Sequence, residues 1–142
     1  MELFTEIEIN ATSDKVWQIL TDSASYPEWN PFVRTLEGEL KVGERVEAFL
    51  KPPNHKGMTF KPRIIKFVPR RELRWYGTIG IPGLFDGEHI FELRSPEPHK
   101  VRFVQREVFK GLLAPLILKS IFANTRAGFE MMNKALKERC ES

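Results

Sequence analysis

The segment from Leu112 to Glu138 constrains the fold more than any other, because it is the only stretch long and periodic enough to predict a helix of many turns. At about 100° per residue, apolar side chains recur along one side of this helix and charged side chains along the other. The apolar side carries Leu113, Ile117, Ile121, Met131 and Ala135. A second apolar arc, about a quarter to a third of a turn away, carries Leu118, Phe122, Phe129 and Leu136. The helix therefore needs apolar partners across a wide angle.

Small or polar residues interrupt the middle of the apolar side. Ser120, Asn124 and Gly128 fill a packed seam poorly and leave room against the facing element. The spacing therefore predicts a cavity between this helix and its partner.

The middle of the chain predicts short strands separated by turns rather than long helices. Turn residues fall at Gly38, Lys41 to Gly43, Pro52 to Asn54, Pro69 to Arg71, Gly80 to Gly87 and Ser95 to His99. The strands between them are predicted at 34–38, 45–51, 57–68, 72–79, 87–94 and 100–110. With an alternating strand at Leu3–Ile9, this gives seven antiparallel strands.

Two short helical segments interrupt this order after the first strand. Thr12 or Ser13 can cap a helix that ends near Asp22, with Val16, Trp17, Ile19 and Leu20 on its apolar side. From Ser23 to Phe32, Pro27 and Pro31 limit any helix to about one turn, and the aromatic residues held by these prolines, such as Trp29, suggest a fixed aromatic corner.

The element order predicts an α+β domain in which the C-terminal helix lies across a twisted seven-stranded antiparallel sheet. The length of 142 residues suits one domain over the whole chain, 1–142. If the small residues of the helix leave a gap on the concave side, the fold encloses a pocket that favours an apolar or amphipathic ligand.

Four motifs resemble those of a known superfamily. They are Ala11 to Leu20 with Val16-Trp17, Tyr26 to Phe32 (YPEWNPF), Gly87 to Leu93 (GEHIFEL) and Glu107 to Pro115 (EVFKGLLAP). Together they resemble the START-related helix-grip superfamily (SRPBCC), and within it the bacterial polyketide cyclase/dehydrase-like proteins. The resemblance extends over essentially the whole chain. It implies a seven-stranded sheet that grips the C-terminal helix, with a ligand cavity between them.

The resemblance leaves three functions open, because members range from lipid transfer to polyketide cyclisation and chaperone activation. The first is binding or transport of a small hydrophobic ligand such as a lipid, isoprenoid, quinone or polyketide. The second is an enzyme of the cyclase or dehydratase kind. The third is a protein-interaction module like the chaperone activators. We favour a non-catalytic binder and expect no cofactor.

His89 and Glu107 are the candidates for chemistry, although neither is a firm catalytic assignment. His89 shares a strand face with Phe91 and Leu93, and an imidazole there can orient a carbonyl or transfer a proton. Glu107 shares its face with Phe103 and Phe109, where a carboxylate needs a partner. The two residues lie on consecutive strands, so contact is possible. The alternative is a core histidine with a structural hydrogen bond or ion pair.

A wider set of residues is predicted to line the cavity because each points inward by strand or helix phase or belongs to the aromatic corner. The set comprises Trp29, Phe60, Trp75, His89, Phe91, Phe103, Gln105, Glu107, Ile117, Ile121, Asn124 and Gly128. Arg63 and Arg106 could neutralise a carboxylate at Glu107, but the strand phase of Arg106 places it outside and that of Arg63 is undecided.

The loop from Gly80 to Gly87 carries apolar residues although a loop is expected to face water. Pro82, Leu84 and Phe85 are predicted either to form a lid at the cavity mouth or to tuck under the C-terminal helix. The glycine spacing is not a phosphate-binding motif, because a strand rather than a helix follows.

Charge and motif content narrow the partners. The net charge of +3 comes from scattered Lys and Arg, so no nucleic-acid partner is expected. The three histidines lack metal-ligand spacing and the one cysteine, Cys140, lies in the polar tail, so no metal site is expected. Apolar runs are too short to span a bilayer, and the N-terminal residues do not resemble a secretory signal. We expect a cytoplasmic protein that makes at most transient membrane contact, with its oligomeric state undetermined.

Overall fold

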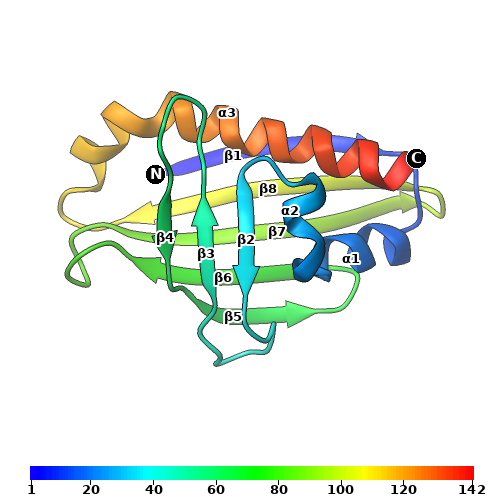
Figure 1. Cartoon of the computed structure of the whole chain (residues 1–142), viewed down its shortest axis with the longest axis horizontal. Helices are drawn as coiled ribbons and strands as arrows, with labels where there is room; N and C mark the ends of the chain where they lie inside the picture. The colour runs from blue at the N-terminus through cyan, green and yellow to red at the C-terminus, as the bar shows by residue number, and fades with distance from the viewer.

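The computed structural model describes residues 1–142 and divides the strands between two antiparallel sheets (Figure 1). The larger sheet has the order β1-β8-β7-β6-β5, and the smaller has the order β2-β3-β4. The strands are β1 (Glu2–Ile9), β2 (Val33–Glu37), β3 (Glu47–Leu50), β4 (Met58–Phe60), β5 (Arg63–Val68), β6 (Glu72–Thr78), β7 (Asp86–Glu97) and β8 (Lys100–Lys110). The helices are α1 (Ser13–Thr21), the 3-10 turn η1 (Ser23–Ser25), α2 (Tyr26–Trp29) and α3 (Ala114–Glu141).

The α+β architecture predicted from the sequence is confirmed, but the strand count is eight rather than seven. The predicted strand 57–68 is broken at Lys61-Pro62, because Pro62 has no N–H to donate to a ladder. The Pro62 carbonyl still accepts a hydrogen bond from Val46 N–H at 2.9 Å. The backbones of Arg45 and Arg63 form an isolated antiparallel β-bridge. The chain therefore turns a corner at Pro62 and passes from the smaller sheet into the larger.

The inward face of the larger sheet is set by its register. Trp75 of β6 pairs with His89 of β7, which in turn pairs with Glu107 of β8. The next row on the same face lies two residues away on each strand and consists of Leu73, Phe91 and Gln105. All three residues are fully buried. The alternation predicted for these three strands is confirmed, because a period of two leaves only one face toward the core.

Helix α3 lies along β1 and β8 and also packs on α1 and α2 (Figure 1). The structure corrects its predicted orientation. The buried face follows most of the second apolar arc, Leu118, Phe129 and Leu136, together with Met132 and Asn133, whereas Phe122 of that arc is exposed. The first arc lies at the edge of this face, where Leu113 and Met131 are exposed. The helix also continues to Glu141, so Cys140 is buried rather than part of a polar tail.

The small residues of α3 have two different fates. Gly128 is packed tightly, since a Cβ there would lie 2.5 Å from Cδ1 of Phe32. Ser120 and Asn124, on the N-terminal half of the helix, are exposed. The α3 residues that border open space, Ile121, Asn124 and Thr125, all belong to this half.

The elements between β1 and β2 follow their local chemistry. The Thr12 hydroxyl accepts a hydrogen bond from Lys15 N–H at 3.2 Å and caps α1. Val16, Trp17 and Leu20 are buried on the core side of α1, as predicted. Helix α2 is a single turn that contains Pro27 and ends before Pro31, in agreement with the predicted limit of about one turn.

Candidate functional site

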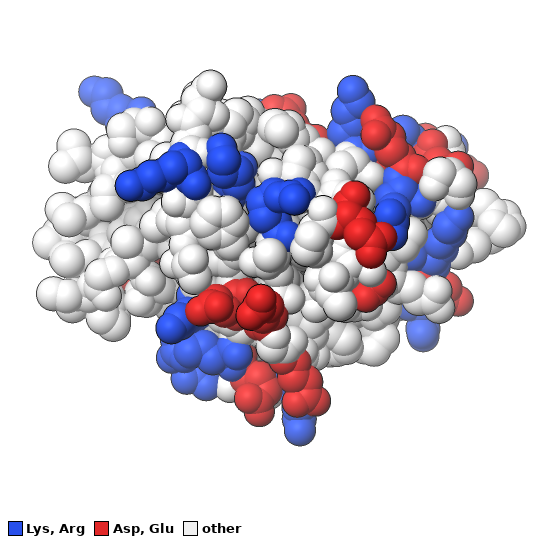
Figure 2. Space-filling model, in the orientation of Figure 1, with Lys and Arg blue, Asp and Glu red and all other residues white.

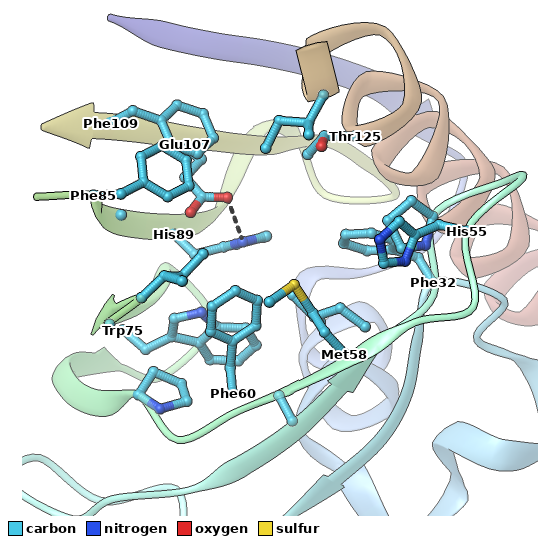
Figure 3. Close-up of a pocket in the computed structure, with 18 of the residues that line it drawn as sticks. Phe32, His55, Met58, Phe60, Trp75, Phe85, His89, Glu107, Phe109 and Thr125 are labelled. Atoms are coloured by element: carbon cyan, nitrogen blue, oxygen red, sulfur yellow. Dashed lines mark ion pairs between the residues drawn. The ribbon is translucent and has the colours of Figure 1, made fainter. Parts of the chain in front are cut away.

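A cavity of about 130 Å³ lies between the larger sheet, the smaller sheet and the N-terminal half of α3 (Figure 3). Its floor is formed by β6, β7 and β8, one wall by β3 and β4, and the opposite wall by α3. The lining residues are Phe32, Ala48, Leu50, Pro52, His55, Met58, Phe60, Pro62, Trp75, Gly77, Ile79, Phe85, Gly87, His89, Glu107, Phe109, Ile121, Asn124 and Thr125.

Aromatic rings make up much of the inner surface. Phe85 stacks on Phe109 with ring centroids 5.6 Å apart, and Trp75 lies 5.1 Å from the imidazole of His89. Phe60, Met58 and Phe32 also line the space, and Figure 3 shows Met58 next to Phe60, with Phe32 farther toward α3. Such a surface favours planar or aliphatic groups over charged ones.

His89 and Glu107 place polar atoms within these apolar walls. They are direct cross-strand partners, and His89 Nδ1 lies 3.4 Å from Glu107 Oε1. The His89 side chain is 3% exposed and that of Glu107 is 18% exposed. Figure 3 shows the pair at the floor of the cavity, with the carboxylate above the imidazole. A carboxylate and an imidazole in contact can orient a ligand oxygen or exchange a proton with it.

The position of the Glu107 carboxylate depends on a glycine in the neighbouring strand. Gly87 precedes His89 by two residues and lies on the same face, and a Cβ there would overlap Glu107 Oε2. The missing side chain of Gly87 thus leaves the space that the carboxylate occupies.

Behind His89, away from Glu107, lies a set of buried polar side chains. His89 Nε2 is 3.0 Å from Gln105 Oε1, and Gln105 Nε2 donates to Asn133 Oδ1 at 2.8 Å. Asn133 Nδ2 donates to the Thr5 hydroxyl at 2.9 Å. All four side chains belong to residues that are buried, so the hydrogen bonds replace those they would make with water.

Polar groups also occur where α3 meets the loop after β3. Asn124 and Thr125 come from the helix and the exposed His55 from the loop. The Nδ1 atom of His55 accepts a hydrogen bond from Gly57 N–H at 2.9 Å, which fixes the loop locally. His55 and Thr125 lie on the outer side of the cavity, across from the His89–Glu107 pair (Figure 3).

The loop before β7 is tied to the beginning of α3. The carbonyls of Gly83 and Leu84 accept hydrogen bonds from Leu112 and Leu113 N–H, each at 2.9 Å. Asp86 accepts from the Tyr76 hydroxyl at 2.8 Å, and this hydrogen bond raises the pKa of Tyr76. Phe85 is 4% exposed and lines the cavity, whereas Pro82 is exposed and lies outside the lining.

The surface around the beginning of α3 is apolar. Ile81 is 68% exposed, Leu112 81% and Leu116 70%. Figure 2 shows few charged side chains on the viewed face at this end of the molecule, and those visible are mainly Lys and Arg.

The structure brings half of the predicted lining together. Phe60, Trp75, His89, Glu107, Ile121 and Asn124 all reach the cavity. Trp29, Phe91, Phe103, Gln105, Ile117 and Gly128 do not, and neither do Pro82 and Leu84 of the loop.

The residues outside the lining have other roles. Phe91 and Phe103 are fully buried in the solid core between the larger sheet and the C-terminal half of α3. Gln105 lies behind His89, and Phe32 covers Gly128. Trp29 packs edge-on against Tyr26, and its indole N–H is buried without a partner. Ile117 is half-buried against the core.

Several lining residues had no sequence signal. Ala48, Leu50, Met58 and His55 belong to β3, β4 and their connection, and the crossing of the smaller sheet over the larger one brings them to the cavity. Phe109 did have a signal, since it shares a strand face with Glu107.

The two arginines considered as partners for Glu107 both lie elsewhere. Arg106 is on the outer face, where it pairs with Glu92 at 2.7 Å. Arg63 is exposed and donates to the Gly43 carbonyl at 2.6 Å. The side chain that contacts the Glu107 carboxylate is therefore His89, through Nδ1 at 3.4 Å.

The chain has neither a metal-binding cluster nor a helix suited to crossing a membrane. No group of three or more His, Cys, Asp or Glu side chains is arranged to hold a metal ion. None of the helices combines the length and the hydropathy that crossing a membrane requires.

Comparison with known proteins places the chain among helix-grip folds. A family model described as polyketide cyclase/dehydrase and lipid transport matches residues 2–141. No curated protein matches the sequence significantly.

Solved structures resemble the fold at low sequence identity. The ZhuI aromatase/cyclase from Streptomyces sp. R1128 is 15% identical, with a TM-score of 0.78 over 99% of this chain and 93% of that one. A protein from Thermus thermophilus is 18% identical, with a TM-score of 0.76 over 99% and 97%. A Thalictrum flavum norcoclaurine synthase mutant, solved with a transition-state analogue, is 14% identical, with a TM-score of 0.75 over 99% and 94%. The predicted helix-grip resemblance is therefore confirmed at the level of fold.

Proposed function

This chain belongs to the polyketide cyclase/dehydrase and lipid transport family, and from that premise we propose that it binds a small, mainly apolar ligand that carries an oxygen. The ligand occupies the cavity between the larger sheet and α3, with its oxygen at the His89–Glu107 pair. The apolar part lies against the aromatic walls.

The observation that carries this proposal is the contrast between the pair and its surroundings. A histidine and a glutamate in contact, at 3% and 18% side-chain exposure, lie among Trp75, Phe85 and Phe109. Burying polar groups costs free energy unless they are paired, and a cavity wall leaves part of their hydrogen-bonding capacity unused. A ligand oxygen can use that capacity.

The size of the cavity limits how large a part of a ligand can enter it without movement of the surrounding side chains. An apolar cavity of about 150 Å³ accommodates benzene, so about 130 Å³ corresponds to roughly one ring. A lipid or polyketide needs more space, which requires the side chains of Met58, Phe60 or Ile121 to move outward. These residues belong to the two walls rather than to the floor.

A second candidate function is catalysis of the cyclase or dehydratase kind. The contact of 3.4 Å between His89 Nδ1 and Glu107 Oε1 favours it, because such a pair can take up a proton at one ligand atom and return it at another. The aromatase/cyclase and norcoclaurine synthase with the same fold supply the analogy.

A binding experiment tests the proposal. Native mass spectrometry of the purified protein detects a co-purified ligand, and calorimetric titration compares 1-naphthol with naphthalene, which lacks the oxygen. We expect 1-naphthol to bind more tightly to the wild type. The affinity for 1-naphthol should fall about ten- to one-hundredfold in His89→Phe and in Glu107→Gln, since a hydrogen bond to a charged group is worth about 1.5–3 kcal/mol.

Glu88→Gln is the matched control, because Glu88 adjoins His89 in β7 but pairs with Arg74 on the other face. Its affinity for 1-naphthol should equal that of the wild type. If neither compound binds and no ligand co-purifies, the proposed binding function is wrong. Turnover of a candidate polyketide substrate that vanishes in both site variants, with unchanged thermal stability, would favour the enzyme over the carrier.

A further inference from the structure

The buried hydrogen bonds behind His89 determine which imidazole nitrogen carries a proton. They run from Thr5 in β1 through Asn133 in α3 to Gln105 in β8, and then to His89 in β7. The order of donors and acceptors along this chain can be derived, because two main-chain carbonyls fix its direction.

The first fixed point is the main-chain carbonyl of Gln105, which can only accept. The Thr5 hydroxyl lies 2.7 Å from it and must donate its single hydrogen there. With its hydrogen used, the Thr5 hydroxyl can only accept a hydrogen bond from the Asn133 side chain, which lies 2.9 Å away. The atom of Asn133 that faces Thr5 is therefore the amide nitrogen. The Asn133 oxygen consequently faces Gln105.

The second fixed point is the carbonyl of Phe129. The side-chain nitrogen of Gln105 lies 2.8 Å from the Asn133 oxygen and 3.4 Å from the Phe129 carbonyl. Both neighbours accept, so the Gln105 amide cannot be reversed without placing oxygen against oxygen at two contacts. Its oxygen therefore faces His89, and Nε2 of His89, at 3.0 Å, must be the donor.

With Nε2 committed to Gln105, the other nitrogen is left for the cavity. Nδ1 faces Glu107 Oε1 at 3.4 Å. An unprotonated Nδ1 against an ionised carboxylate would bring two lone pairs together without a hydrogen. One proton between them, on either atom, removes this repulsion.

We propose that Thr5, Asn133 and Gln105 are positioning residues that hold His89 in the Nε2–H form, so that Nδ1 and Glu107 share one proton at the cavity floor. The role of this proton toward a ligand rests on the proposed function, but the protonation pattern belongs to the free protein. Because the pair holds one proton, it can donate a hydrogen bond to a ligand carbonyl oxygen or accept one from a ligand hydroxyl. It therefore suits ligands of either kind.

The surroundings of the ring leave few other groups that could control it. Trp75, Phe91 and Phe129 pack on the imidazole from β6, β7 and α3, and none of them titrates. Glu107 is the one acidic residue of the cavity lining, and His55 is the other histidine there, on the outer side. The chain through Asn133 also ties the ring to α3, the element that closes the cavity.

Nitrogen-15 NMR of histidine-labelled, ligand-free protein tests the proposal directly. The chain has three histidines, and the exposed His55 and His99 serve as internal references. At neutral pH we expect His89 to show a protonated Nε2 and an Nδ1 shift between the protonated and the bare extremes. A bare Nε2 with a protonated Nδ1 would overturn the proposed tautomer, and a fully bare Nδ1 would overturn the shared proton.

Substitutions separate a positioning role from a merely structural one. Gln105→Leu removes the acceptor, so the proton of His89 should move to Nδ1, where Glu107 can accept it. Gln105→Glu keeps an acceptor oxygen and should keep the proton at Nε2. Glu107→Gln should leave Nδ1 bare, because a neutral amide donates its own N–H. An unchanged His89 spectrum in Gln105→Leu would contradict the proposal.

The anchor at Thr5 gives a second test that does not depend on the folding of Gln105→Leu. Thr5→Val has nearly the same shape but lacks the hydroxyl, so we expect the Nδ1–H form to appear beside the Nε2–H form. Thr5→Ser should restore the wild-type spectrum, and equal spectra for the two variants would refute the role of Thr5. Normal spectra combined with failure of 1-naphthol to bind would reject the proposed function and leave the positioning intact.

Discussion

At the scale of single residues, the site depends on side chains that are absent as much as on those present. Gly87 lacks the Cβ that would overlap the Glu107 carboxylate, and Gly77 beside it on β6 also lines the cavity. These two glycines are paired on adjacent strands, so the inner face of the sheet carries no side chains at this point beside the polar pair. The space of the cavity therefore arises partly in the strands and not only in α3.

Gly87→Ala tests this dependence. The new methyl group would push the carboxylate of Glu107 away from its position. The flexible side chain can move, so the free energy of unfolding should fall by no more than about 3 kcal/mol. We expect Nδ1 of His89 to lose its partner and 1-naphthol to bind about as weakly as to Glu107→Gln. Nitrogen-15 NMR and calorimetry measure these effects. Wild-type behaviour in both would show that the carboxylate does not need the space.

At the scale of elements, α3 has two halves with different tasks. The C-terminal half packs through Phe129, Met132 and Leu136, all fully buried, and contributes to the core. The N-terminal half leaves a gap toward the sheet and contributes Ile121, Asn124 and Thr125 to the cavity. Gly128 lies at the boundary, where the ring of Phe32 covers the helix backbone.

Gly128→Ala makes two physical effects compete. Replacing glycine by alanine in a helix ordinarily stabilises the fold by about 0.5–1 kcal/mol. Here the Cβ would lie 2.5 Å from Phe32 Cδ1 and 2.8 Å from Cε1. Overpacking of this kind costs about 1–3 kcal/mol, so we expect net destabilisation in urea unfolding, together with a smaller cavity because Phe32 also lines it.

Ser120→Ala is the control on the same helix, because Ser120 is exposed. Its unfolding free energy should rise slightly, in line with the helix propensity of alanine. A stabilised Gly128→Ala would mean that Phe32 moves aside without cost.

At the scale of the whole molecule, charge is distributed over the outer face of the larger sheet. Ile90 and Val104 are buried on this face, outside the main core cluster. Their strand neighbours include Arg106 and Glu92, whose side chains pair at 2.7 Å, with Glu2 also within reach of Arg106. Partial burial raises the pKa of Glu92, but hydrogen bonds and charges from Arg106 and Arg94 lower it by more, so the net pKa lies below its usual value.

The lowered pKa of Glu92 predicts a pH dependence of stability with a definite sign. The ionised form is favoured in the folded state, so its contribution is complete above the unfolded pKa, about 4.3. It is lost as the pH falls through the lower folded value. Glu92→Gln should therefore cost about 1–2 kcal/mol at pH 7 and show a shallower loss of stability in acid.

Urea midpoints at pH 7 and at pH 3 measure the difference. Glu130→Gln is the matched control, because Glu130 makes an exposed pair with Arg126 at 3.8 Å. It should change the unfolding free energy by less than about 0.5 kcal/mol. Equal pH profiles for wild type and Glu92→Gln would contradict the predicted contribution.

Local chemistry was enough to predict most elements. The Thr12 cap, the single turn of α2 and the alternation of β6, β7 and β8 could all be predicted, because each depends on neighbours within a few residues. The same alternation predicted only that contact between His89 and Glu107 was possible. The exact pairing required the observed register, in which the two residues are directly opposite.

The sequence by itself determined which faces of the strands are apolar and that a long C-terminal helix must cover them. The tertiary structure decided where that helix packs closely and where it leaves space, because this depends on Phe32 meeting Gly128 across 96 residues of chain. It also decided the turn at Pro62, which brings the smaller sheet over the cavity, and the burial of Asn133 behind His89. These features arise from contacts between distant segments, and side-chain periodicity within one segment carries no information about them.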